Sequence, residues 1–254
     1  MLHSNKNREN LYDLWLNAVK ERNDNFIYVA NTMVKSALSY IDSYIKEESV
    51  VLDLGCGNGL ITNVMSSISK NVYGMEIDID KVNEAKEKYK KPFFINRDIQ
   101  KLPFEDNTFD IITSFSVLQY VDWKKTLCEI HRVLKPNGKI VFLENLKGNP
   151  FVILYRKVRP HIDNPNMIPK KHIKWSEIKE FKHYFKVNVF ETFHLTTPLS
   201  LGIKNIKITN TTNPMDSNIC YNFLRNIDVF TVKYLKFFRR FSWNFVLYGE
   251  KVIS

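Results

Sequence analysis

The sequence predicts an α/β protein with a mostly parallel β-sheet covered by helices on both faces. Short apolar segments typical of buried strands alternate with segments of helical periodicity up to about residue 150, and this alternation is characteristic of parallel sheets. A glycine-rich turn directly follows the first of these strands. The chain has 254 residues, of which 44% are hydrophobic, and this is enough for one sizeable core. We expect a single domain over residues 1–254.

The spacing of apolar residues predicts the elements in the first part of the chain. Apolar side chains at helical spacing indicate two amphipathic helices before the turn, at about 11–19 and 26–45. The expected strands are 50–54, 71–76, 92–96, 109–114 and 139–144. A helix at about 123–134 separates the last two strands.

Beyond residue 150 the alternation becomes irregular, and several prolines mark a crossover. We expect a helix that begins near Ser176 as its N-cap, a strand at about 186–191, a loop-like stretch at 196–222, a helix at about 224–241 and a last strand at 243–248. No linker long enough to separate a second domain interrupts this region. It is therefore expected to elaborate the same domain.

The glycine-rich turn predicts a ligand pocket. Gly55, Gly57 and Gly59 fall within the five residues that follow the strand at 50–54. Because glycine lacks a Cβ, it adopts positive φ and lets the backbone approach a ligand closely. The helix expected to begin at Leu60 presents unpaired N–H groups and the positive end of its dipole. These features are typical of a site for a nucleotide or a related cofactor.

This part of the chain resembles the class I S-adenosylmethionine-dependent methyltransferases, in their small-molecule, type 11-like branch. Residues 51–59 match the family's glycine motif almost letter for letter, and the resemblance is close over about 48–148. A dinucleotide motif, G-x-G-x-x-G, is the alternative, but it would need a glycine where Leu60 stands. The resemblance implies S-adenosylmethionine as cofactor, S-adenosylhomocysteine as product, and a Rossmann-like sheet of seven strands whose last strand is antiparallel.

The resemblance also divides the domain into three segments. Residues 1–47 would supply N-terminal helices that form a lid over the cofactor, with Tyr12 and Trp15 as candidates, although an amphipathic packing face explains both residues equally well. Residues 48–148 would form the cofactor-binding core. Residues 149–254 would form a basic elaboration and cap on the acceptor side, together with the final strands.

The resemblance assigns residues to the parts of the cofactor. The glycine turn would contact the methionine portion, with Asp53 near its ammonium group. Glu76 would accept hydrogen bonds from the ribose hydroxyls, and Asp98 would accept one from the adenine amino group, as suits ionised carboxylates. The alternatives are a surface acid at 76 and a turn-capping aspartate at 98. The expected cofactor-binding residues are Asp53, Gly55, Cys56, Gly57, Gly59, Glu76, Ile77, Asp98, Ile99 and Ser114.

Catalytic residues are harder to predict, because the methyl group of a sulfonium is already activated. Its transfer is an in-line displacement that mainly requires alignment and exclusion of water. A general base would help if the acceptor is a hydroxyl. The candidates by position are Gln119, Tyr120, His161, His172 and His194. His131, near the end of a helix, is expected to have a structural role, and no metal site is expected.

Charge is distributed unevenly along the chain, whose formal net charge is +10. Residues 1–150 contain about 20 basic and about 20 acidic residues, so residues 151–254 hold the remaining 17 and 7. This asymmetry favours an anionic partner for the C-terminal part, although a general drift toward basic composition would also produce it. We expect methyl transfer to a small or lipid-linked, anionic acceptor of sugar, glycan or natural-product type. The alternatives are methylation of RNA or another nucleic acid, and a non-catalytic binding module that keeps the fold.

The helix expected at 224–241 carries a stripe of aromatic side chains, with Lys233, Lys236 and Arg240 on another face. Ordinary core packing explains such a stripe. An interfacial helix near anionic lipid and a surface for single-stranded nucleic acid are the alternatives. Peripheral membrane contact through 227–241 therefore stays open.

Other features favour a cytoplasmic protein. The three cysteines are dispersed and match neither a disulfide framework nor a zinc-binding pattern. No apolar stretch approaches the roughly 20 residues that span a bilayer. The first residues lack the apolar core of a secretory signal.

Overall fold

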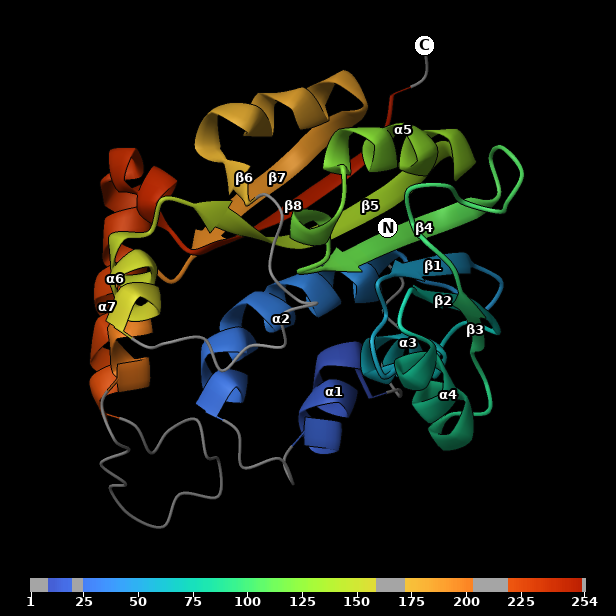
Figure 1. Cartoon of the computed structure of the whole chain (residues 1–254), viewed down its shortest axis with the longest axis horizontal. Coiled ribbons are helices and arrows are strands. Elements are labelled where there is room, and N and C mark those ends of the chain that lie inside the picture. Colours follow the sequence, from blue (N-terminus) through green and yellow to red (C-terminus); the bar gives the residue numbers. More distant parts are fainter. Residues whose placement is uncertain (1–8, 20–24, 159–171, 203–218, 253–254) are drawn as a thin grey trace.

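The computed structural model in Figure 1 describes residues 9–19, 25–158, 172–202 and 219–252. Its centre is a mixed β-sheet with the strand order β3-β2-β1-β4-β5-β8-β7. In that order the strands are Phe93–Asn96, Asn71–Glu76, Val50–Leu54, Phe109–Phe115, Leu134–Lys147, Asn244–Lys251 and Phe185–Phe193. A two-residue strand, β6 (Ile173–Lys174), pairs with β5 outside this order.

The strands of the main sheet are parallel, apart from β8, which is antiparallel to both of its neighbours, β5 and β7. The predicted seven-stranded, mostly parallel sheet with an antiparallel last strand is therefore confirmed. Only β6 was not expected. The carboxyl ends of β1, β2, β4, β5 and β7 all lie on the same side of the sheet. We call this side, which is formed by strand ends and not by an outer strand, the edge of the sheet; ligands bind there in open α/β sheets.

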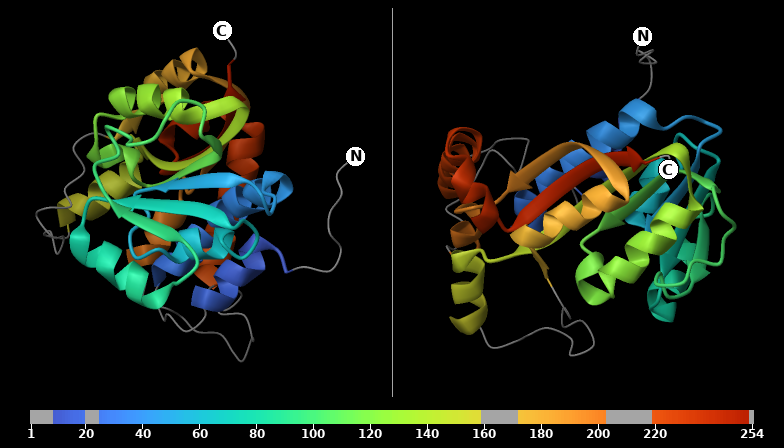
Figure 2. Two further views of the ribbon diagram at one scale, coloured as in Figure 1. Left: turned by 90° about the vertical axis from the view of Figure 1, so that its right-hand side faces the viewer. Right: turned by 90° about the horizontal axis from the view of Figure 1, so that it is seen from above.

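Helices cover both faces of the sheet, as predicted (Figures 1 and 2). One face carries α1 (Leu11–Val19), α2 (Asn25–Tyr44), α3 (Leu60–Met65) and α4 (Ile79–Lys88). The other face carries α5 (Trp123–Val133) and the 3-10 helix η3 (Trp175–His183). Two further helices, α6 (Pro150–Val158) and α7 (Ile219–Tyr234), lie together at the end of the molecule farthest from β3. The remaining 3-10 helices are η1 (Leu118–Tyr120), η4 (Thr197–Gly202) and η6 (Lys236–Phe241).

The alternation of side chains along the strands produces two hydrophobic cores. Leu52 of β1 packs on the same side as Trp123 and Phe181, under α5 and η3. Its neighbour Val51 faces the opposite side and packs with Leu38 of α2. The rings of Trp123 and Phe181 stack with their centroids 5.5 Å apart and 6° between their planes. The sheet therefore holds its helices through apolar contacts on both faces.

The structure differs from the prediction at the helix expected to begin near Ser176. The structure has a 3-10 helix there, and its N-cap is Lys174. The backbone N–H of Lys174 donates to the Glu177 carboxylate at 2.8 Å. Because Glu177 satisfies this terminal donor, the helix begins earlier than a Ser N-cap would place it.

The expected boundaries at 196–222 and 224–241 are also wrong. The supposed loop contains η4 and the start of α7, and residues 203–218 lie outside the described part. The single helix expected at 224–241 is interrupted at Leu235, whose φ of −109° and ψ of 66° are not helical. This break separates α7 from η6. Among the described helices, none combines the length and the apolar character needed to cross a membrane.

The stacked pair between α5 and η3 generates a prediction about stability. Phe181→Ala removes a fully buried ring, so we expect the free energy of unfolding to fall by about 3–5 kcal/mol in urea titrations. Phe223→Ala is the matched control, because this phenylalanine is 64% exposed and its loss should change stability by less than about 0.5 kcal/mol. Equal effects of the two substitutions would contradict this description of the core.

Candidate functional site

The glycine turn lies at the carboxyl end of β1 and is held at two of its three glycines. Gly55, Gly57 and Gly59 have φ values of 65°, 54° and 81°, which L side chains rarely adopt. A Cβ on Gly55 would lie 2.4 Å from Val117, and a Cβ on Gly59 would lie 2.7 Å from Phe94. A Cβ on Gly57 would meet nothing within 4 Å. The turn is therefore packed against its neighbours at both ends and open in the middle.

Asp53 connects the turn to the structure beneath it. Its carboxylate accepts hydrogen bonds from the hydroxyls of Thr62 at 2.7 Å and Thr113 at 2.9 Å. Burial raises the pKa of Asp53 to about 6, although these hydrogen bonds oppose the shift. Asp53 thus joins β1 to α3 and β4, and only 2% of it is exposed.

Glu76, at the carboxyl end of β2, lies against the open part of the turn. Its Oε2 accepts a hydrogen bond from the backbone N–H of Gly57 at 3.0 Å. Its Oε1 accepts from the N–H groups of Ile77 at 2.9 Å and Asp78 at 3.1 Å. The side chain of Ile77 is 69% exposed.

The other predicted residues on this side follow β3 or lie within the turn. Asp98 is exposed and accepts hydrogen bonds from the backbone and the side-chain amide of Gln100, both at 2.9 Å. Ile99 is buried in the core next to it. The N–H of Cys56 donates to the carbonyl of Met75 at 2.9 Å, and burial raises the pKa of the Cys56 thiol. A thiol held neutral in this way is a poor nucleophile.

Glu144, at the end of the strand predicted at 139–144, is a residue that the sequence interpretation missed. It is fully buried, and it accepts hydrogen bonds from the Ser114 hydroxyl at 2.6 Å and from the N–H groups of Val117 at 3.1 Å and Leu118 at 3.2 Å. It therefore fixes the loop that packs Val117 against Gly55. An acid that ends an apolar run was the available signal, as it was for Asp53 and Glu76.

A row of buried polar side chains runs along the same edge of the sheet, from the loop after β4 to the end of β7. Asn145 donates to Gln119 at 3.0 Å, and Asn244 donates to Asn145. The Nδ1 of His194 lies 2.8 Å from the Asn244 side-chain oxygen. All four side chains are buried. The row fixes the positions of four neighbouring segments at this edge.

The structure does not gather the candidate general bases in one place. The Gln119 amide donates to the carbonyl of Ser116 at 3.1 Å and accepts from Asn145, so both of its ends are bonded. Tyr120 is half-buried at the end of η1, and His172 precedes β6. His194 lies at the opposite end of the polar row. His161 lies outside the described residues.

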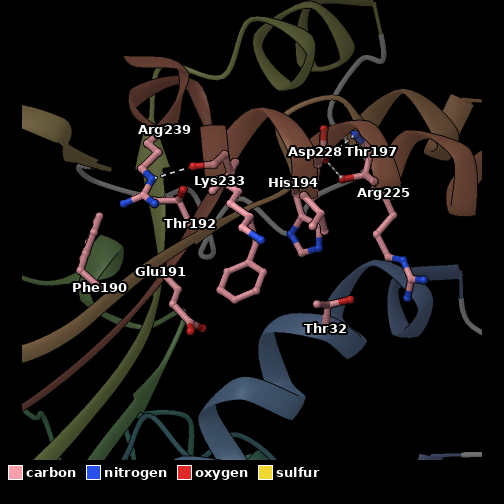
Figure 3. A pocket seen from close by; sticks show the side chains of 13 residues that line it. Thr32, Phe190, Glu191, Thr192, His194, Thr197, Arg225, Asp228, Lys233 and Arg239 are labelled. Atoms are coloured by element: carbon pink, nitrogen blue, oxygen red, sulfur yellow. Dashed lines mark hydrogen bonds between the residues drawn. The ribbon is translucent and has the colours of Figure 1, made fainter. Parts of the chain in front are cut away.

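A cavity of about 300 Å³ lies at the far end of the same edge, between β7, α7 and α2. Figure 3 shows Lys233 and His194 pointing into the space between α7 and Thr32 of α2, with Arg225 extending toward α2. Its lining residues are Thr32, Phe190, Glu191, Thr192, Phe193, His194, Thr197, Arg225, Asp228, Val229, Val232, Lys233 and Arg239. The lining therefore combines basic groups with apolar walls.

The two acidic residues of the cavity do not cancel the positive charge of its lining. Asp228 is buried, and its carboxylate accepts hydrogen bonds from the hydroxyl and the N–H of both Thr196 and Thr197. Glu191 accepts a hydrogen bond from Ser36 of α2. Three basic side chains, Arg225, Lys233 and Arg239, line the cavity with these two acids, so the lining suits an anion. Within the described residues, no group of three or more His, Cys, Asp or Glu is placed to hold a metal ion.

The ionisation of Glu144 generates a prediction about pH. Burial raises the pKa of Glu144 from 4.5 to about 7, so between these values the folded state keeps a proton that the unfolded state has released. The contribution of this group to stability is complete below pH 4.5 and is lost as the pH rises through about 7, by roughly 3 kcal/mol in total. The Glu144→Gln variant has no ionisable group at this position. Asp53 is present in both proteins and contributes equally to the pH dependence of their stability. Denaturant titrations should show wild-type stability falling relative to the variant over this range, and parallel pH profiles would contradict the assignment.

Comparison with known sequences identifies relatives of a large part of the chain. A family model for a methyltransferase domain matches residues 52–142. An uncharacterized protein of Methanocaldococcus jannaschii is 31% identical over 179 residues, which cover 68% of this chain and 72% of that protein. A sterol 4-C-methyltransferase of Caenorhabditis elegans is 32% identical over 114 residues, 42% of this chain and 34% of that protein. A malonyl-(acyl-carrier protein) O-methyltransferase of Buchnera aphidicola is 26% identical over 156 residues, covering 60% and 62%.

Solved structures show the same fold. A chain from the Haloferax volcanii complex that contains the Trm112 methyltransferase activator matches with a TM-score of 0.61 and 19% identity, covering 97% of this chain and 100% of that one. An S-adenosylmethionine-dependent methyltransferase from Mesorhizobium loti matches with a TM-score of 0.57 and 14% identity, covering 88% and 98%. With its glycine motif, sheet order and relatives, the chain belongs to the class I S-adenosylmethionine-dependent methyltransferases, and its cofactor is S-adenosylmethionine.

Proposed function

We propose that the pocket between the glycine turn and the carboxyl ends of β1, β2 and β4 binds S-adenosylmethionine. The residues proposed to form it are Asp53, Gly55, Cys56, Gly57, Gly59, Glu76, Ile77, Asp98, Ile99 and Ser114. The open position of Gly57, between two glycines that are packed against neighbours, supports this assignment. A side chain at this position would occupy the space that the cofactor needs.

The acids around the turn have the chemistry that the cofactor requires. From the described residues, the Oε2 of Glu76 accepts one hydrogen bond, so this oxygen has capacity for a ribose hydroxyl. The exposed side chain of Ile77 offers an apolar surface beside it. The exposed carboxylate of Asp98 can accept from an amino group. These are properties of the residues themselves, and they fit the adenosine end of the cofactor.

When bound, S-adenosylmethionine supplies an activated sulfonium methyl group. The chain must hold the acceptor in line with that group and keep water away. We assign no general base. Gln119 is proposed to position neighbouring segments, because both ends of its amide are already bonded. Tyr120 and His161 stay candidates if the acceptor is a hydroxyl.

We propose that the methyl acceptor is anionic, and the observation that supports this most strongly is the cation-lined cavity at the ligand-binding edge of the sheet. Arg225 and Lys233 would bind a phosphate or carboxylate of the acceptor. β7 lies four strand spacings from β1, which at roughly 4.8 Å per spacing is about 19 Å. An acceptor with its anion in the cavity must therefore be extended, as a lipid-linked or phosphate-bearing molecule is.

One relative is named for an acceptor on a larger carrier, a malonyl group on an acyl-carrier protein, and another for a lipid acceptor, a sterol. Within the proposed single domain, residues 48–148 would bind the cofactor and 149–254 the acceptor. Residues 1–47 would close the pocket, although Trp15 is buried in the core and does not itself form a movable cover.

The three cysteines are free, which supports a reducing, cytoplasmic environment.

The cofactor pocket is tested by calorimetric titration with S-adenosylhomocysteine. Glu76→Gln and Asp98→Ala should each weaken binding by about 10–100-fold, since each removes a charged hydrogen-bond acceptor worth about 1.5–3 kcal/mol. Asp80→Ala is the control, because Asp80 is an exposed acid in the first turn of α4 and outside the proposed contacts. Unchanged affinity in Glu76→Gln or Asp98→Ala, with the fold intact, would remove the corresponding role.

The acceptor site is tested with labelled S-adenosylmethionine and fractionated cell extract, followed by identification of the labelled product by mass spectrometry. We expect an anionic, extended small molecule or lipid. Replacing Arg225 and Lys233 together with alanine should raise the KM for this acceptor about tenfold or more while cofactor affinity is unchanged, and Lys88→Ala on the distant α4 should have no effect.

Two results would contradict the proposed acceptor. Labelled RNA, bound with an affinity that falls steeply and log-linearly with salt, would identify a nucleic-acid methyltransferase. Cofactor binding without transfer to any fraction would identify a non-catalytic module.

A further inference from the structure

Large apolar side chains are exposed on the helices at the end of the molecule farthest from β3. Phe223, Phe230, Tyr234 and Phe237 are between 58% and 64% exposed. With Ile227 and Phe238, which are also exposed, they form what we call the aromatic surface. Such a concentration of exposed rings is rare on a protein that has no partner.

The aromatic surface is one continuous face of α7 that extends into η6. Phe223, Ile227, Phe230 and Tyr234 follow one another at intervals of four, three and four residues, and this spacing places them on one side of a helix. Tyr221 and Asp228 are buried on the other side. Ordinary core packing, the first interpretation of this stripe, is therefore wrong. The stripe faces outward because Asp228 holds the opposite face of α7 against Thr196 and Thr197.

The charges around the aromatic surface are almost all positive. Between residues 219 and 241 the sequence has the five cations Arg225, Lys233, Lys236, Arg239 and Arg240. Its one acid there is Asp228, which is buried and hydrogen-bonded inward. Aromatic rings flanked by cations, without exposed acids, complement a layer of anionic headgroups over an apolar interior.

Cation–ring contacts keep the charged groups next to the rings. The Arg240 guanidinium lies 3.6 Å from the centroid of the Phe237 ring, and the Lys233 ammonium lies 5.1 Å from that of Tyr234. Long basic side chains in this arrangement can extend to headgroups while rings enter the boundary of the acyl region. Both elements of interfacial binding are therefore present on the same short segment.

The same end of the molecule includes part of α6. Ile153 and Leu154 of α6 are exposed, and Figures 1 and 2 show α6 and α7 at this one end, away from the glycine turn. Exposed apolar side chains at this end therefore come from more than one helix. Since no described helix can cross a bilayer, such a surface suits attachment to one side of a membrane.

We propose that the aromatic surface, together with its flanking cations, binds the surface of anionic membranes. The rings enter the headgroup region, and Lys236 and Arg240 contact anionic lipids. Arg225 and Lys233 lie on the same helix and line the cavity on its inner side, so docking places the cavity about one helix diameter, roughly 10 Å, from the headgroups. The docking itself does not depend on the identity of the methyl acceptor, whereas its use to reach a lipid-linked acceptor rests on the proposed function.

Vesicle sedimentation of the full chain tests this inference. We expect binding to vesicles of phosphatidylcholine and phosphatidylserine in equal amounts, weak binding to phosphatidylcholine alone, and weakening by salt. Replacing Phe230 and Phe237 together with serine should lower the partition coefficient at least about tenfold. Lys236→Glu with Arg240→Glu should lower it for the anionic vesicles specifically.

The control is Phe93→Ser, which changes an exposed ring on the opposite edge strand, β3, and should leave vesicle binding unchanged. Thermal unfolding verifies that each variant is folded. Equal binding of wild type and the double serine variant would overturn the proposal. So would a dimer that the serine substitutions dissociate, or binding to polyuridylate in place of vesicles. Cofactor affinity is measured separately. A protein that binds vesicles but not the cofactor would contradict the proposed function and leave the membrane proposal intact.

Discussion

The structure depends on the steric constraint at the glycine turn after β1. Three backbone positions with positive φ must fit between Val117 and Phe94, and this fit leaves the backbone of Gly57 accessible. Strand-terminal acids hold the arrangement from three directions. Asp53 ties β1 to α3 and β4, Glu76 binds the N–H of Gly57, and Glu144 fixes the loop that carries Val117. The proposed cofactor pocket rests on this convergence.

The second organising feature is the polar row that continues from the pocket along the edge of the sheet. Hydrogen bonds among Gln119, Asn145, Asn244 and His194 hold four neighbouring segments in register between the glycine turn and the cation-lined cavity. Buried polar groups that are paired in this way fix relative positions more strictly than apolar contacts do. A methyltransferase needs this rigidity, because donor and acceptor must be aligned at contact distance.

The sequence predicted the features that local patterns encode. Apolar runs with terminal acids identified β1 and β2, and the glycine spacing identified the turn between β1 and α3. The seven-stranded, mostly parallel sheet and its antiparallel last strand, β8, were expected from the family resemblance and are confirmed. The role of Glu144 was missed because its donors lie 26 to 30 residues away in sequence, in β4 and the loop after it. The outward face of α7 was missed for a similar reason, since Asp228 meets Thr196 and Thr197 only in the folded chain. Periodicity reports that a helix has two faces, but long-range contacts decide which one is buried.

The most direct test of the central claim is a crystal structure of the protein with S-adenosylhomocysteine. Our account predicts the ligand over Gly57, with its ribose hydroxyls at the Glu76 carboxylate and its adenine between Ile77 and Asp98. A ligand that occupies the cavity between β7 and α7 instead, or a complex in which the glycine turn makes no contact with it, would contradict the account.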